Sequence, residues 1–278
     1  MAAFHDPRSE AVIPVSPKPR PRCSRPPGTY VSDGLLGSEV AACTFASSGR
    51  AKPFGHIDIR SCRLTRLDHR ARFFASALAA VAGYVDATGF LMTGGYFVSF
   101  MSGNSTRLGV GLALGAWEAV VAAGLIGSFT AGVMGGAALR RLVRGRPEAK
   151  ILLVVSLALS LSAATLIVGL RELAFLLLAF AMGAENTVFA EAGEVRIGLT
   201  YMTGALVRVG KGLVVALFGG ERLAWLPYLL LWLGLVLGTA VGAVAYSRLG
   251  PASLWYAAGA MAMLSVISLR VFPVSQEE

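Results

Sequence analysis

Charged residues are scarce in this sequence of 278 residues: Asp, Glu, Lys and Arg make up 15% of it, against roughly 25% in soluble domains. Histidine and cysteine are scarcer, with three of each, and neither occurs after His69. Beyond that point Asp86 is the only aspartate. The apolar part therefore lacks the His of a Ser-His hydrolase, the second Asp of an intramembrane aspartyl protease and the ligands of a usual metal site. These absences predict a protein that is not an enzyme and holds no metal or cofactor, although an enzyme that works through Arg and Glu is left open.

Hydrophobic residues, by contrast, make up 55% of the chain, and the mean hydropathy is +0.65. A helix needs about 20 residues to cross the roughly 30 Å of hydrocarbon in a bilayer. The sequence offers eight apolar runs, of which the second and the sixth are short, polar and rich in glycine. We expect these two to be re-entrant or half-length helices and the other six to span. The runs cover 73–94, 100–115, 117–140, 149–170, 172–190, 200–218, 223–247 and 251–272.

The two ends of the chain differ in composition from this middle part. Residues 1–70 hold eight of the twelve prolines, every cysteine and eleven of the twenty-five Lys and Arg, which predicts a disordered basic tail. No apolar segment follows the N-terminus, so a cleaved signal peptide is not expected. Four acids in the first 40 residues disfavour a transit peptide, and a translation start nearer the membrane domain is left open. We place the membrane domain at 71–272 and a short C-terminal tail at 273–278.

Basic residues set the expected orientation. Five arginines crowd the approach to the first run, and RRLVRGRPEAK (140–150) separates the third run from the fourth. Because loops rich in Lys and Arg stay in the cytoplasm, both segments are assigned to that side. They can share a side only if the second run, within 96–111, enters the membrane without crossing it. Treating 200–215 in the same way gives six spans with both termini cytoplasmic, in a bacterial inner (plasma) membrane.

The two short runs carry one pattern twice. FMSGNSTRLGVGL (100–112) aligns without gaps on YMTGALVRVGKGL (201–213), and AGYVDA (82–87) matches MGAENT (182–187) upstream. Because each half then has three crossings, the halves must have opposite orientations, a pattern typical of transporters with a midplane site.

The predicted fold is therefore all-α: a polytopic membrane helix bundle of about six spans plus two short or re-entrant helices. It is built from two inverted repeats, at 71–170 and 171–272. The small residues of GVMGG (132–136) and GLVLGTAVG (234–242) are expected to let helices pack closely.

Three motifs, AGYVDATGFL, FVSFMSGNSTRLG and LTYMTGALVRVGKGL, point to a known family. They resemble the G-x-x-D, M-T/S-G-N-x-T and T-x-x-T-G elements of the YoaK-like family of uncharacterised bacterial membrane proteins. The resemblance covers about residues 71–272. That family often has Gln-Asn near the start of its second half, where this chain has Glu185 and Asn186. The resemblance implies an integral inner-membrane protein of unknown function.

Asp86 lies in the middle of a run expected to span, where a carboxylate is costly unless it faces a cavity or a partner. We expect Arg107 or Lys211 to be that partner, with protonation as the alternative to pairing. A buried hydrogen bond between helices, or a position near the membrane interface, would explain Asp86 without a functional role.

The two broken segments supply further donors and positive charge. Short helices that point their N-termini inward would offer free N–H groups to an anion or a carboxylate. The competing explanation is that Gly, Ser and Thr at these spacings only let helices pack closely. Glu185 is expected in a wetted loop with the charges that follow it, a place in the site being the alternative. The candidate binding residues are Asp86, Ser102, Asn104, Thr106, Arg107, Asn186, Thr203, Arg208 and Lys211.

Inverted repeats with polar broken helices favour a secondary transporter or channel for a small polar or anionic solute bound near the bilayer midplane. A non-transporting membrane scaffold or sensor is the alternative. Membrane lipids and such a solute are the expected partners, nucleic acid is not, and the sequence leaves the oligomeric state open.

Overall fold

A computed structural model describes residues 69–115, 117–143, 145–191, 194–195 and 202–272. The predicted tails at 1–70 and 273–278 lie outside the described residues, except for the two residues that begin the first helix. Within the described part the fold is helical apart from one short pairing, of β1 (Ala190–Glu191) antiparallel to β2 (Glu194–Val195). The prediction of an all-α membrane fold is confirmed at this level.

The helices follow the predicted apolar runs one by one. Proline begins two of them in the first turn, at Pro147 and Pro227, where its missing N–H removes no helical hydrogen bond. Gly115 and Gly250, with φ of 65° and 58°, follow the last residues of α2 and α7 in a conformation that favours glycine. The elements are α1 (His69–Thr93), α2 (Met101–Leu114), α3 (Glu118–Leu142), α4 (Pro147–Ile167), α5 (Arg171–Glu185), α6 (Met202–Leu217), α7 (Leu226–Leu249), the 3-10 turn η3 (Gly250–Ala252) and α8 (Ser253–Val271).

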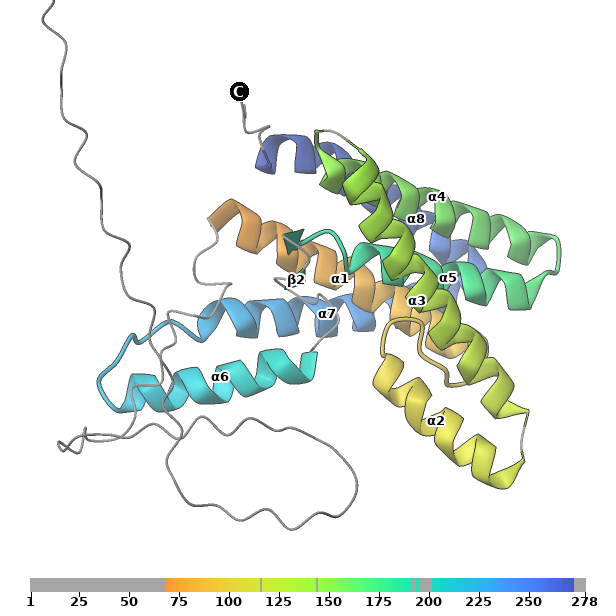
Figure 1. Cartoon of the computed structure of the whole chain (residues 1–278), viewed down its shortest axis with the longest axis horizontal. Coiled ribbons are helices and arrows are strands. Elements are labelled where there is room, and N and C mark those ends of the chain that lie inside the picture. Colours follow the sequence, from red (N-terminus) through yellow and green to blue (C-terminus); the bar gives the residue numbers. More distant parts are fainter. Residues whose placement is uncertain (1–68, 116, 144, 192–193, 196–201, 273–278) are drawn as a thin grey trace, which may run out of the picture. The chain divides into compact units, whose positions relative to one another are not determined.

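Two pairs of helices, α1 with α7 and α3 with α5, pack closely through glycine (Figure 1). Gly234 of α7 faces Ser76 of α1, Gly238 faces Ala80 and Gly242 faces Tyr84, so the order is the same along both helices. In the other pair Gly132 of α3 faces Phe180 of α5, and Gly136 faces Ala184. Both pairs therefore run parallel, and the expectation that these glycine-rich stretches pack helices closely is confirmed.

The remaining large contacts are antiparallel. The Ser156 hydroxyl of α4 donates to the carbonyl of Ala258 in α8 (2.8 Å), and the Ser265 hydroxyl of α8 donates to the carbonyl of Ala149 in α4 (2.6 Å). The Tyr84 hydroxyl of α1 reaches the first residue of α8 (2.9 Å). Since α4 and α5 form a hairpin, the six helices other than α2 and α6 alternate in direction along the chain.

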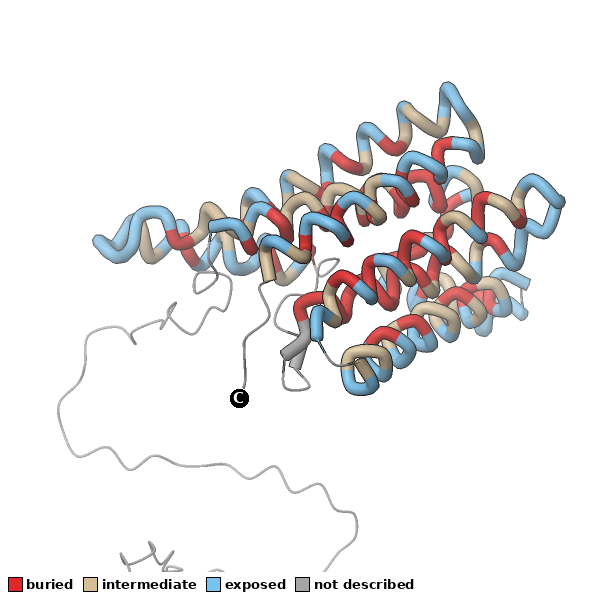
Figure 2. Tube along the Cα trace, turned by 90° about the horizontal axis from the view of Figure 1, so that it is seen from above, coloured by how far each residue is buried: buried red, intermediate tan, exposed pale blue. Residues whose placement is uncertain are grey.

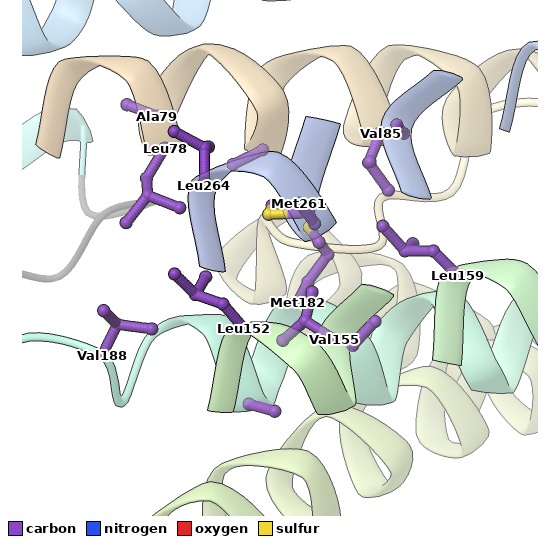
Figure 3. Packing of buried hydrophobic residues seen from close by; sticks show 14 of the residues in the cluster. Leu78, Ala79, Val85, Leu152, Val155, Leu159, Met182, Val188, Met261 and Leu264 are labelled. Carbon is purple, nitrogen blue, oxygen red and sulfur yellow. The ribbon is translucent and has the colours of Figure 1, made fainter. Parts of the chain in front are cut away.

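The core lies between α1, α4, α5 and α8. Figure 3 shows side chains from these four helices pointing into one apolar interior, among them Val85, Val155, Leu159, Met182 and Met261. Figure 2 shows the buried residues on the inward faces of the helices and the exposed ones outside.

The outer surface is apolar, as expected for helices that contact lipid. On α4, for example, Leu153, Leu157 and Leu161 are all exposed at a spacing of four residues. Four helical stretches of the described chain are long and apolar enough to cross a membrane. They are α1, α3, α4 and Leu226–Val271, which contains α7, η3 and α8.

Candidate functional site

The link between α1 and α2 folds back along α1. Gly95, at φ of 113°, lies in the turn. Val98 then packs against Gly89, and the N–H of Ser99 reaches the carboxylate of Asp86. Because a helix rises 1.5 Å per residue, the chain has returned about 10 Å toward the middle of α1 by this point. The short helix α2 therefore begins beside the interior of α1 rather than beside its end.

Asp86 anchors this returning segment. Its Oδ1 accepts hydrogen bonds from the backbone N–H groups of Val98 (3.0 Å) and Ser99 (2.8 Å), and the residue is 6% exposed. Hydrogen bonds to an ionised carboxylate are stronger than those between neutral groups. Asp86 thus supplies the acceptor for two backbone donors that have no helix or sheet around them.

Asn104, in the first turn of α2, holds the same segment from the other side. Its Oδ1 accepts the N–H of Phe97 (3.1 Å) and its Nδ2 donates to the carbonyl of Phe97 (2.6 Å). The side chain is 0% exposed. The amide therefore replaces a neighbouring strand, as non-helical backbone inside a membrane protein requires. Asp86 and Asn104 form what we call the link clamp.

The expected ion pair between Asp86 and Arg107 is not formed. The guanidinium of Arg107 lies over the ring of Tyr96, with 4.7 Å from Cζ to the ring centroid, and Arg208 lies over the ring of Tyr228 at 5.1 Å. Within the described residues neither arginine makes an ion pair. A cation over an aromatic face is stabilised without a carboxylate, so each arginine packs its short helix against a tyrosine ring.

The other predicted residues of the short helices face outward. Ser102, Thr106, Thr203 and Lys211 are exposed, and the Thr106 hydroxyl bonds back to the carbonyl of Ser102 (3.2 Å). Helix α2 packs on α3 and α6 packs on α7, while α2 and α6 do not pack on each other in the described structure (Figure 1). Of the nine candidate residues, the structure brings together Asp86 and Asn104 alone, at the link clamp.

Glu185, expected in a wetted loop, is instead fully buried at the end of α5. It is 0% exposed, and neither Oε1 nor Oε2 has a hydrogen-bond partner in the part of the chain that the structure describes. It follows the core residues Leu178 and Met182 at helical spacing, so it lies on the same face of α5. That spacing was the sequence signal that could have placed it. Asn186, next in the chain, is buried and donates to the carbonyl of Met182 (2.8 Å).

One cation lies near the end of α5. Arg140, in the last turn of α3, donates to the carbonyl of Val188 (2.5 Å) and forms an ion pair with Glu148 of α4 (3.0 Å). Its Nε is buried and has no hydrogen-bond partner among the described residues. The N–H of Val188 donates in turn to the carbonyl of Glu185 (3.0 Å). Arg140 therefore has one N–H without a partner among the described residues, and Val188 links it to Glu185, whose carboxyl has none either.

Comparison with known proteins assigns the chain to a family. Residues 74–267 match the model of the family described as "Protein of unknown function (DUF1275)". The chain is also 39% identical over 201 residues to the UPF0700 transmembrane protein RA0705 of Rhizobium meliloti (strain 1021), covering 70% of this chain and 85% of that protein. No solved structure matches. The resemblance drawn from the motifs is confirmed: the chain belongs to the DUF1275 family, whose function is unknown, and is a multi-pass membrane protein.

Proposed function

We propose that the chain crosses the bacterial inner membrane six times, with both termini in the cytoplasm. The alternating directions of α1, α3, α4, α5, α7 and α8 support six crossings. The apolar stretch Leu226–Val271 counts as two spans because the backbone turns at Gly250. Helix α5, at 15 residues, is shorter than a usual span and crosses together with the segment that follows it.

The proposal includes two inverted repeats. The approach of Gly83 in α1 to Leu235 in α7 is matched by that of Gly183 in α5 to Phe129 in α3. Exchanging α1 with α5 and α3 with α7 thus reproduces the same glycine contact. The same exchange maps the α2–α3 hairpin onto the α6–α7 hairpin. It also maps each helix onto a helix that runs in the opposite direction. This relation supports halves of opposite orientation.

The topology can be tested with reporter fusions. Fusions after residues 72, 145 and 272 are expected to report the cytoplasm, and fusions after residues 116 and 169 the periplasm, because three crossings separate the two ends of each half. Activity of a periplasmic reporter at residue 145 would contradict the arrangement. A cytoplasmic signal at residue 169 would contradict it as well.

For function, we propose a proton-coupled secondary transporter of a small polar or anionic solute. The single observation that carries this is Glu185, a carboxyl buried in the core with no hydrogen-bond partner among the described residues. An unpaired carboxylate is too costly in such surroundings, so Glu185 must hold a proton or meet a cation in another conformation. Arg140 is the candidate cation, since its Nε has no hydrogen-bond partner among the described residues and its guanidinium bonds to Val188, three residues after Glu185.

The other charged side chains on the helices packed against α5 do not offer a pair. On α1 the carboxylate of Asp86 is held by the link clamp, Arg70 is exposed, and His69 and Arg72 already have interactions of their own. On α3 and α4, Glu118, Arg141 and Lys150 are exposed, and Glu148 is already paired with Arg140. Movement between a protonated, buried Glu185 and a Glu185 paired with Arg140 would couple a proton to the alternation of the two repeats. The link clamp would keep the broken segment rigid during that motion.

Carbodiimide labelling tests the protonated state without a known solute. Dicyclohexylcarbodiimide reacts with carboxyl groups that hold a proton in apolar surroundings, so peptide mass spectrometry is expected to find the adduct on Glu185. Glu118 and Glu172, in the wet first turns of α3 and α5, are the internal controls and should stay unlabelled. Equal labelling at all three positions, or none at Glu185 between pH 5 and pH 8, would reject the proton site.

Vesicles then test transport. Protein reconstituted with an entrapped pH dye is challenged with gradients of phosphate, sulfate, nitrate, short carboxylates and neutral amino acids. One solute class is expected to drive a pH change in wild-type vesicles that Glu185→Gln abolishes. If carbodiimide labels Glu185 but no solute causes a pH change in the vesicles, the second candidate, a non-transporting scaffold or sensor, is favoured. The observation behind that candidate is that five of the nine predicted binding residues are exposed on the outside of the short helices.

A further inference from the structure

A groove of about 440 Å³ lies between the first turns of α1 and the last turns of α8. Its walls are hydrocarbon, from Phe73 and Ala77 on one side and Leu264, Ile267 and Val271 on the other. The ring of Phe73 is largely exposed to the outside of the bundle. The groove therefore offers an apolar channel open to the surroundings of the helices, where lipid chains lie.

Cations stand at one end of this groove. Because α1 and α8 are antiparallel, Arg70 in the first turn of α1 and Arg270 in the last turn of α8 both line it, next to His69. Neither arginine has an ion-pair or hydrogen-bond partner among the described residues, and both are exposed. Helix α8 carries no acid, and the one acid of α1, Asp86, lies more than four turns from Arg70. Within the described parts of α1 and α8, the positive charge at this end of the groove is thus uncompensated.

We propose that this groove binds one anionic phospholipid, with its phosphate on Arg70 and Arg270 and an acyl chain between α1 and α8. A ligand of this groove must match two features at once: two guanidinium groups, which bind phosphate oxygens well, and a hydrocarbon wall that starts directly beneath them. A soluble anion would satisfy the first alone and an apolar peptide the second alone. Basic pockets between membrane helices at the cytoplasmic surface are suited to anionic headgroups.

The site does not depend on transport. It would tie the N-terminal turn of α1 to the C-terminal turn of α8, which are the first and last turns of the described bundle. Bound lipid stabilises whichever conformation keeps those turns together, since a ligand favours the state that it binds.

Native mass spectrometry of the full chain in detergent tests the proposal. Phosphatidylglycerol and phosphatidylcholine are added at equal concentration, and the retained lipid is counted. We expect phosphatidylglycerol to be retained about tenfold more, and the double variant Arg70→Gln, Arg270→Gln to lose that preference. Ile267→Trp, which fills the groove and leaves both arginines in place, should lower retention to a similar degree.

The matched control is the double variant Arg141→Gln, Lys150→Gln, which removes the same charge from exposed positions at the end of α3 and the start of α4. It should retain phosphatidylglycerol as the wild type does. If the control loses as much phosphatidylglycerol, general surface charge retains the lipid, and the proposal is overturned. Equal retention of the two lipids by the wild type would overturn it too. If only a chain ending at Phe272 binds phosphatidylglycerol, residues 273–278, with two glutamates, occupy the groove instead and the proposal fails.

Discussion

Replacement of Gly132 by alanine is expected to separate α3 from α5 and to lower the yield of folded protein severalfold. A Cβ at this position would overlap the backbone carbonyl of Phe180, which cannot rotate away as a side chain can. Inserting even one carbon into a well-packed contact costs about 1–3 kcal/mol, and a clash with backbone belongs at or above the upper end of that range. The free energy of unfolding, measured by titration with sodium dodecyl sulfate in mixed micelles, should fall by about that amount.

The matched control is Gly127→Ala, five residues earlier on the same helix. A Cβ there would meet nothing within 4 Å, so this variant tests the same chemical change without the contact. It should unfold like the wild type, or slightly later, because alanine favours helix over glycine. Equal loss of stability in the two variants would mean that glycine matters at these positions for helix geometry and not for the approach of α5.

The second large effect is expected at the link clamp. Asn104→Ala would leave the partly buried N–H and carbonyl of Phe97 without their partner, and each such group costs up to about 1–3 kcal/mol. The expected loss in the free energy of unfolding is therefore up to about 2–6 kcal/mol. Ser105→Ala is the control, since that hydroxyl is exposed and only bonds back to the carbonyl of Met101 (2.8 Å).

The same experiment separates the two roles of Asp86. Asp86→Asn keeps an Oδ1 that can accept both N–H groups, so it should retain most of the stability. Asp86→Ala removes the acceptor and should resemble Asn104→Ala. If Asp86→Asn unfolds as readily as Asp86→Ala, the negative charge stabilises the protein, and the hydrogen bonds alone are not a sufficient account of the residue.

Hydrophobic pattern was enough to locate the helices. The run predicted at 100–115 became α2 at Met101–Leu114, and the run at 200–218 became α6 at Met202–Leu217. Both boundaries follow from glycine and from loss of apolar residues, which are local properties of the sequence. The close approach of α3 to α5 was also readable, because small residues spaced four apart share one helix face.

The partners of the polar residues were not readable in the same way. Asp86 could meet a guanidinium or two backbone N–H groups, and both would stabilise it equally well in principle. The choice depends on how sharply the chain turns at Gly95, which places Val98 and Ser99 beside the carboxylate. Since Arg107 stacks on Tyr96 instead, Arg107→Ala is expected to leave both hydrogen bonds of Asp86 in place.

The sequence also did not predict which residues of the short helices are exposed. Ser102 and Thr106 lie on α2, whose residues mix polar and apolar character on every side, so its pattern does not say which face turns inward. Glu185 was hard to place for another reason: polar and charged residues follow it in the sequence, from Asn186 to Glu194, but its neighbours at helical spacing are core residues. For a residue at a helix end, the helical neighbours proved the better guide.

The parallel pairing of α1 with α7 also bears on the order in which the protein is synthesised. Ala80 leaves the ribosome 158 residues before Gly238, the glycine that packs on its carbonyl. At about 5–20 residues per second, α1 waits on the order of ten seconds for its principal partner. During that interval the turns around Ala80 face lipid, the insertion machinery or a temporary neighbour. A ribosome stalled before α7 should therefore leave α1 accessible to crosslinkers placed at Ala80, and release through α8 should protect it.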